Sequence, residues 1–222
     1  MALDVRRSAI LETLVRAYLH DGAPLSSQFI AGRMPFPVSS ATVRNEMAVL
    51  EKEGYLVQPH VSAGRIPTAE ALRIVVHRMR EQRSLAHAIP HREAPHREVA
   101  DNGALARRLA YEVHAAAFIA SGAQEVFAGF EFVLASPELR DGEALADFAQ
   151  LLNTAAFWRE RLMAALTDPL LVFIADENPI FPTAHFSVVA ARLGSGALAA
   201  LVGPLRMRYD LAISSLDHFV TA

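Results

Sequence analysis

Residues 38–68 read VSSATVRNEMAVLEKEGYLVQPHVSAGRIPT, and the fold assignment depends on this stretch. Serines at positions 39 and 40 can cap a helix that runs to about Glu53, and Gly54 can end it. Residues 55–67 read as two short strands around Ser62-Ala63-Gly64, after which Thr68 can cap another helix. The stretch therefore predicts a helix, a hairpin and a further helix in that order.

Two helices and a turn are predicted before this stretch. Asp4 to His20 places apolar residues at 10, 11, 14, 15, 18 and 19, which form one helical stripe. A short second helix is expected to start at Ser26 or Ser27, and Met34-Pro35-Phe36-Pro37 is a turn because proline cannot continue a helix. The order helix, helix, turn, helix, hairpin, helix predicts a winged helix-turn-helix over residues 1–83.

The predicted third helix has one apolar face and one face suited to a DNA groove. Val43, Met47 and Leu50 share the apolar face, while Ala41, Asn45, Ala48 and Lys52 lie opposite, flanked by Thr42 and Arg44. Arginine can read guanine bidentately and asparagine can read adenine, while a helix start offers donors to phosphate. The predicted DNA-binding residues are Ser39, Ser40, Thr42, Arg44, Asn45, Gln58, His60, Ser62, Gly64 and Arg65.

Within the predicted hairpin, Gly64 is expected to let the backbone approach a sugar-phosphate chain, and Arg65 to contact phosphate. The alternative is a winged helix used only for protein contact. A polar face without an apolar patch argues against it, because protein interfaces are anchored by aromatic or aliphatic side chains.

Composition excludes several classes of protein. The 222 residues contain no cysteine, which excludes disulfides, cysteine-ligated zinc and thiol catalysis and fits a cytoplasmic localisation. No apolar run is long enough for a membrane span. The net charge of −3 is uneven, since residues 1–83 carry 11 Lys and Arg against 8 Asp and Glu. A basic amino-terminal part suits a polyanionic partner at that end.

The rest of the chain is predicted to be a linker followed by a second domain, residues 103–222. The linker, residues 84–102, has two prolines and three histidines and no apolar period. The predicted elements beyond it are a helix over 104–120, a strand over 126–134, one or two helices over 142–166, a strand over 170–175, a hairpin of 186–193 with 197–202, and a helix over 209–220.

Other constellations are weak, and no catalytic residue, metal or cofactor is predicted. His87, His91 and His96 are better explained by a solvated linker than by a metal site, because a proline separates each pair. Asp176-Glu177-Asn178 could suggest acid–base chemistry, but it precedes Pro179 and is more typical of a turn at a strand end. The aromatic side chains Phe127, Phe130, Phe132, Phe157 and Trp158 fit a ligand pocket and a packed core equally well.

The stretch 38–68, together with RRSAILETLVRAYLHDGAPLSS at 6–27, closely resembles the heat-inducible transcription repressor family, HrcA. LLVFIADENPIF at 170–181 and LAALVGPLRMRYDLAISSLDHFV at 198–220 are similar to that family's carboxy-terminal segments. The sequence departs from the family between 84 and about 124, where other members have a longer middle that includes an inserted dimerisation domain.

The resemblance implies an α+β protein with a winged helix-turn-helix and a shortened, GAF-like α/β regulatory and dimerisation domain. It implies a homodimeric repressor of chaperone genes that binds an inverted repeat, the CIRCE operator, in double-stranded DNA. It also implies the chaperonin GroEL as a partner. Two alternatives stay open: a GAF-like domain that responds to a small molecule, and direct sensing of heat by melting of the second domain.

Overall fold

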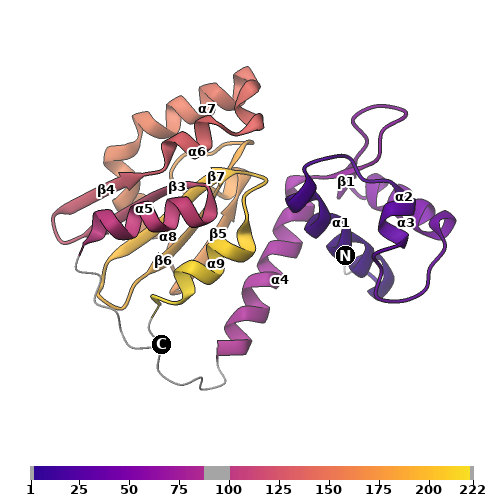
Figure 1. Cartoon of the computed structure of the whole chain (residues 1–222), viewed down its shortest axis with the longest axis horizontal. Helices are drawn as coiled ribbons and strands as arrows, with labels where there is room; N and C mark the ends of the chain where they lie inside the picture. Colours follow the sequence, from indigo (N-terminus) through magenta and orange to yellow (C-terminus); the bar gives the residue numbers. More distant parts are fainter. Residues whose placement is uncertain (1–2, 88–100, 221–222) are drawn as a thin grey trace. The chain divides into compact units, whose positions relative to one another are not determined.

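The computed structural model describes residues 3–87 and 101–220, with side chains described as far as residue 83 in the first range. The chain divides into two compact units, residues 1–77 and 78–222, and each is considered by itself (Figure 1). The predicted linker lies mostly outside the described residues. Its flanks belong to helices, because α4 runs from Ala69 to His87 and α5 begins at Asn102.

The first unit contains three helices, a two-stranded antiparallel hairpin and the start of α4. The elements before α4 are α1 (Val5–Asp21), α2 (Ser27–Ala31), α3 (Ser40–Lys52), β1 (Leu56–Val57) and β2 (Ile66–Pro67). The elements predicted from the sequence in this unit are present. The helix ends lie within two residues of those expected, but β1 ends at Val57 and is shorter than the strand expected to reach the turn at Ser62. The domain boundary at residue 83 and the winged-helix function stay predictions.

Local signals explain where these helices begin and end. The Asp4 carboxylate caps α1 by accepting from the Arg7 backbone N–H, and Gly22, with φ of 69°, ends that helix in the left-handed conformation. The Ser26 hydroxyl caps α2. A core forms where the buried faces of α1 and α3 meet, and its fully buried members include Leu11, Leu14, Val43, Met47 and Leu50.

The second unit is built on a five-stranded antiparallel sheet in the order β4-β3-β7-β6-β5. Its strands are β3 (Ala116–Ser121), β4 (Gln124–Ala128), β5 (Leu170–Ile174), β6 (Phe186–Arg192) and β7 (Leu198–Pro204). Its helices are α5 (Asn102–Val113), α6 (Phe130–Leu134), α7 (Gly142–Asn153), α8 (Trp158–Ala165) and α9 (Tyr209–Asp217), with short 3-10 turns η1 (Pro137–Arg140), η2 (Ala155–Phe157) and η3 (Ala175–Glu177).

Helices cover both faces of this sheet. α5 and α9 pack on one face, where α5 contacts β3 and β4 and α9 contacts β5 and β6 (Figure 1). On the other face, Phe118, Val188 and Ala200 pack against side chains from α6, α7 and α8. Because neither face meets water, every residue of β7 is buried and the central strands lack the polar alternation of a half-exposed strand. This mixed α/β arrangement fits a GAF-like domain.

Two sequence predictions in this unit are wrong. The helix expected over 104–120 ends at Val113, because His114 adopts the left-handed conformation with φ of 59°, and residues 116–121 form the inner strand β3. The strand expected over 126–134 ends at Ala128. Gly129, with φ of 82°, turns the chain into α6, and a Cβ at this position would lie 2.4 Å from the Ala110 side chain.

The remaining predicted elements of the second unit are confirmed. The helical region over 142–166, the strand at 170 and the hairpin around Gly194-Ser195-Gly196 are present, and the last helix ends at Asp217 rather than Val220. Within the described parts of the chain, none of the helices is both long and apolar enough to cross a membrane.

Candidate nucleic-acid interface

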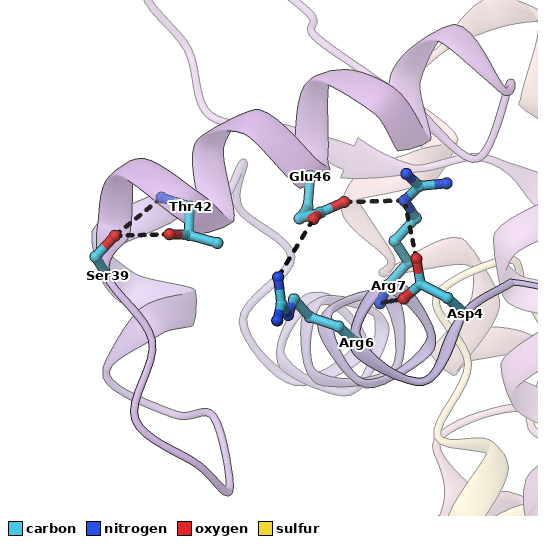
Figure 2. Close-up of polar contacts among 6 residues, drawn as sticks. All are labelled: Asp4, Arg6, Arg7, Ser39, Thr42 and Glu46. Atoms are coloured by element: carbon cyan, nitrogen blue, oxygen red, sulfur yellow. Dashed lines mark hydrogen bonds and ion pairs between the residues drawn. The ribbon is translucent and has the colours of Figure 1, made fainter.

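The start of α3 is fixed by a side-chain cap. The Ser39 hydroxyl accepts a hydrogen bond from the Thr42 backbone N–H at 3.1 Å and lies 2.9 Å from the Thr42 hydroxyl (Figure 2). Both hydroxyls are therefore bonded to each other in this structure. Ser40, at the first helical position, is exposed and carries the next hydroxyl at this helix end.

Ion pairs hold α3 against α1. The Arg7 Nε donates to the Glu46 carboxylate at 2.9 Å, and its Nη1 donates to Glu53 at 3.4 Å. Figure 2 shows Glu46 between Arg7 and Arg6, whose guanidinium lies 4.0 Å from the same carboxylate. The hydrogen bond to Glu46 raises the pKa of the Arg7 guanidinium above its ordinary value.

A third acidic residue, Glu51 of α3, is paired with an arginine of the hairpin. Arg65, in the hairpin, donates to the Glu51 carboxylate from Nε at 2.9 Å and approaches it with Nη2 at 2.8 Å. Glu46, Glu51 and Glu53 are thus all paired with arginines of neighbouring elements. Their negative charge is compensated locally, which reduces the repulsion that a polyanion would meet at α3.

The opposite face of α3 presents side chains that have no internal role. Arg44 and Asn45 are exposed, and in the described part of the chain neither side chain makes a hydrogen bond or an ion pair. Thr42 and Ala48 are half-buried beside them. Arg44 and Asn45 are adjacent in sequence and both carry planar groups able to bond base edges. This face is the part of the predicted site that is available to a ligand.

The hairpin loop is braced from within by Gln58. Its Nε2 donates to the carbonyl oxygens of Val61 and Ala63, each at 2.9 Å, and the Ala63 N–H donates to the His60 carbonyl at 2.8 Å. The amide group of Gln58 therefore holds the turn. The sequence predicts a DNA contact for Gln58, and in the structure its Nε2 group donates within the hairpin.

Gly64 has a different reason to be glycine than the one predicted. A Cβ at this position would lie 2.4 Å from the carbonyl carbon and oxygen of Leu25. The same approach is held by two backbone hydrogen bonds between Leu25 and Arg65, at 3.0 and 2.9 Å. The close approach expected toward a sugar-phosphate chain is made here to the segment that precedes α2, and it anchors the hairpin.

At the tip of the hairpin, four consecutive residues are exposed: Pro59, His60, Val61 and Ser62. The Val61 side chain is 99% exposed, an unusual position for a β-branched apolar residue. Val61 is not among the residues predicted from the sequence to bind DNA. The available signal was its place beside Ser62-Ala63-Gly64, at the centre of the turn, where an apolar side chain has no core to enter.

The ten predicted residues therefore separate into two groups. Ser40, Arg44, Asn45, His60 and Ser62 are exposed with outward polar groups, on α3 and at the hairpin tip. Ser39, Thr42, Gln58, Gly64 and Arg65 are bonded or packed inside the unit. The ion pair between Arg65 and Glu51 joins the hairpin to α3, so the two exposed sets belong to one connected framework.

The second unit offers weaker candidates. The rings of Phe127, Phe130 and Trp158 pack with Phe118 and Phe148 in the core, at centroid distances of 4.8 to 6.1 Å. Phe132 instead contacts Tyr111 and His114, and Phe157 is 52% exposed, so the five aromatics do not line one pocket.

The Asp176-Glu177-Asn178 sequence forms a turn in this structure. Asp176 and Glu177 lie in the short turn η3 at the end of β5, as predicted, and the Glu177 carboxylate accepts from the Ile174 N–H at 3.1 Å. His91 and His96 lie outside the described residues. Among those described, no cluster of three His, Cys, Asp or Glu side chains has metal-binding geometry.

Comparison with known proteins gives both fold and family. A crystal structure described as that of a hypothetical protein superposes with a TM-score of 0.75 over 98% of this chain and 95% of its own, at 18% identity, so it shows the fold alone. Heat-inducible transcription repressors HrcA of Lachnoclostridium phytofermentans and Kineococcus radiotolerans are 46% identical over 83 residues and 49% over 76, which are 37% and 34% of this chain.

These matches cover only 24% and 22% of the two repressors, so the chain aligns with about a quarter of its curated relatives' length. The model of the HrcA protein C-terminal domain matches residues 48–213, which is well over half of the chain. On that match, the chain belongs to the HrcA family.

Proposed function

We propose that this protein is a DNA-binding repressor of heat-inducible genes, and that its first unit acts as a winged helix-turn-helix. The single observation that carries the proposal is the exposed face of α3, where Arg44 and Asn45 have no internal partner among the described residues. The curated relatives, which are named heat-inducible transcription repressors, support the biological context. The proposal requires no catalytic residue and no cofactor, and it implies a cytoplasmic protein.

In this proposal α3 enters the major groove. The Arg44 guanidinium can donate two hydrogen bonds to a guanine, and the Asn45 amide can both donate to and accept from an adenine. Ser40 and the backbone N–H groups at the start of α3 bond a phosphate, which fixes the helix in register. The paired glutamates, Glu46 and Glu51, leave little uncompensated negative charge near the groove.

The hairpin has a supporting role. Its tip, with His60 and Ser62, lies against the backbone next to the groove, while Gln58, Gly64 and Arg65 keep the tip in one conformation. A preorganised loop loses less conformational entropy when it binds, which favours affinity. Contacts to backbone phosphates position the protein and carry no sequence information, so specificity rests mainly on α3.

A homodimer on an inverted repeat completes the proposal. Two tethered α3 helices bind two half-sites, so the second contact is intramolecular and the affinity exceeds that of one unit alone. Regulation through GroEL is the further expectation for the family. Sedimentation and circular dichroism on heating without chaperonin distinguish it from direct thermosensing, since only a direct sensor dissociates or melts near the heat-shock temperature.

The test is binding of the purified protein to a CIRCE-like inverted repeat and to a scrambled duplex, by fluorescence anisotropy over a range of salt concentrations. We expect selective binding to the repeat with a steep salt dependence. Arg44→Ala and Asn45→Ala should each cost about 1–3 kcal/mol on the repeat and relax the preference at one base pair per half-site.

The matched control is Arg108→Ala, which removes the same charge from an exposed position of α5 in the second unit. It should leave both the affinity and the salt slope close to those of the wild type. Loss of affinity that is equal for Arg44→Ala and Arg108→Ala would mean that overall charge, rather than the α3 face, determines binding. Equal binding of repeat and scrambled duplex by the wild type would contradict operator reading.

A further inference from the structure

The tip of the hairpin carries an apolar side chain that the rest of the protein does not cover. Val61 has the largest exposed fraction of the large apolar side chains in the described residues. Its neighbours His60 and Ser62 are polar and exposed. From Pro59 to Gly64 the sequence contains no acidic residue. The tip is therefore a single apolar group between polar ones, with no carboxylate side chain to repel a polyanion.

The position of Val61 is fixed by the loop around it. The Gln58 Nε2 donates to the carbonyl of Val61 itself and to that of Ala63. At the end of the loop, Arg65 is paired with Glu51 of α3. The exposed valine is therefore held by contacts that also connect the hairpin to α3, and a side chain held in this way loses little conformational entropy when a partner covers it.

The small apolar area around Val61 disfavours a protein as that partner. In the described part of the first unit, the other exposed large apolar side chains are Val5, on α1, and Val57, which is 43% exposed. Protein interfaces have an apolar core with aromatic or aliphatic anchors, which two valines of one hairpin do not supply. Duplex DNA offers a narrower surface. Its minor groove adjoins the major groove across one sugar-phosphate backbone, and the C–H edges of the sugars form its walls.

The dimensions of the hairpin suit the minor groove. Val61 lies five residues after Leu56, the first residue of β1, so the tip extends at most about 17 Å from that point. Figure 1 shows the loop after β1 projecting beyond the helices of the first unit. The minor groove of B-DNA is about 6 Å wide and about 7.5 Å deep, which admits a valine side chain. The tip can therefore pass the backbone that borders the major groove.

We propose that Val61 is a specificity-determining side chain, which enters the minor groove beside each α3 contact and selects A·T over G·C base pairs there. At A·T pairs the floor of this groove carries acceptors only, whereas at G·C pairs the guanine N2 amino group protrudes from it. Val61 cannot bond that amino group, so covering it leaves a donor without a partner. His60 favours the same choice, because a narrow A·T minor groove has an enhanced negative potential that attracts histidine.

This inference rests on the proposed function and adds a second form of reading to it. α3 reads base edges in the major groove by hydrogen bonds, through Arg44 and Asn45. Val61 reads base pairs that α3 does not touch, and it does so by the shape of the groove. Apolar side chains recur at minor-groove contacts of other DNA-binding proteins for the same reason: they fill space that a polar group would need to hydrate.

Inosine provides the direct test, because an I·C pair presents the major-groove pattern of G·C but lacks the N2 amino group. Three inverted repeats carry A·T, G·C or I·C pairs on either side of each half-site, and fluorescence anisotropy measures binding of the full chain. The wild type should bind the A·T and I·C repeats alike and the G·C repeat more weakly, on the order of tenfold. Equal affinity for the G·C and I·C repeats would overturn the proposal.

Val61→Ala assigns the preference to this side chain. The affinity for the A·T and I·C repeats should fall on the order of tenfold, because two methyl groups leave the groove, and the preference over G·C should disappear. The matched control is Val5→Ala, which truncates the same residue type at an 85% exposed position on α1 and should behave like the wild type. An unchanged preference in Val61→Ala, or an equal loss in Val5→Ala, contradicts the proposal.

The same measurements separate this inference from the proposed function. If Arg44→Ala abolishes selective binding and Val61→Ala keeps the preference for I·C over G·C, the repressor stands and the role of Val61 is wrong. If the wild type binds repeat and scrambled duplex alike yet weakens when I·C is replaced by G·C in both, Val61 reads the groove and operator reading by α3 is wrong. If the tip docks on a protein instead, Val61→Ala binds every duplex like the wild type, which rejects the inference.

Discussion

α3 and the hairpin of residues 55–67 carry the same kinds of polar side chain and use them in opposite ways. On α3, Arg44 and Asn45 are exposed and make no side-chain bond within the described chain. In the hairpin, Arg65 is 17% exposed and paired with Glu51, and Gln58 donates to two carbonyl groups. An arginine and an amide are therefore exposed and free of internal bonds in one element, and stabilise the fold in the other.

The difference has a physical origin in the two backbones. α3 satisfies its backbone groups internally, begins at a cap and packs on α1, so its outward side chains are not needed for stability. β1 and β2 have two residues each, and an isolated two-stranded hairpin is marginal in water. Side chains must supply the stability that so short a ladder lacks. Residues of similar type should therefore respond differently to substitution, and four pairs test this.

The largest effect is expected from Gly64→Ala. The new Cβ would lie 2.4 Å from the Leu25 backbone, which cannot move without breaking the two hydrogen bonds between Leu25 and Arg65. We expect the first unit to lose about 3 kcal/mol of unfolding free energy, in the upper range for overpacking. Gly32→Ala is the control, because its nearest neighbours would be 3.7 Å away, and it should change the free energy little.

The measurement follows the two units separately. The only tryptophan, Trp158, is buried in the second unit, so its emission reports that unit alone. Helical circular dichroism reports both units. A Gly64→Ala protein should lose part of its circular dichroism at lower temperature while the Trp158 transition stays in place. Equal melting curves for Gly64→Ala and Gly32→Ala would show that the hairpin anchor contributes nothing to stability.

Arg65→Met and Arg44→Met compare the two arginines, keeping much of each aliphatic stem. Arg65→Met removes a two-point contact to Glu51 and should cost about 2 kcal/mol of stability in the first unit, as expected for hydrogen bonds between charged groups. Arg44→Met should leave stability within about 0.5 kcal/mol and reduce operator affinity instead.

The salt dependence of DNA binding distinguishes a structural role of Arg65 from a direct contact with DNA. If Arg65 is a scaffold residue, its loss weakens binding to all duplexes without lowering the salt slope. If the slope of log affinity against log salt concentration decreased in magnitude by about one, Arg65 would contact a phosphate directly, as the sequence suggested.

Gln58→Glu and Asn45→Asp exchange each amide for a carboxylate of the same shape. In the hairpin, the exchange replaces the N–H donors with an oxygen that faces the carbonyls of Val61 and Ala63, so a loss of about 1.5 kcal/mol is expected. On α3, the exchange touches no internal bond and should reduce DNA affinity only. Thermal melts and anisotropy on both variants measure the contrast, and an unchanged melt for Gln58→Glu would argue against the brace.

The first unit was predictable because its signals are local. Side-chain caps, prolines and glycines mark the helix ends there, and their effects act within a few residues. The second unit contains the errors because long-range contacts determine β3. Its sequence, Ala116 to Ser121, is alanine-rich and favours a helix locally, yet helices on both faces of the sheet need small, buried residues there.

The exposed face of α3 was predictable from the sequence, whereas the internal contacts of the hairpin side chains were not. Helical periodicity correctly gave the exposed face of α3, because a helix fixes which positions point outward. No periodic rule gives the direction of a side chain in a tight loop, so the internal contacts of Gln58 and Gly64 could not be read from the sequence. The exposure of Val61 could not be read from the sequence for the same reason, because Gln58 bonds the Val61 carbonyl and the sequence does not mark the two residues as partners.

The smallest contrast is between two adjacent serines at the start of α3, and it tests whether the comparison holds within the helix itself. Ser39 caps α3 through the Thr42 N–H, so Ser39→Ala should cost about 1 kcal/mol of stability. Ser40→Ala removes an exposed hydroxyl with no internal bond in the described structure and should leave the melt unchanged while weakening binding to all duplexes. If Ser39→Ala instead weakened DNA binding with no change in melting, its hydroxyl would belong to the interface. An internal hydrogen bond would then not predict whether a side chain contributes to stability or to DNA binding.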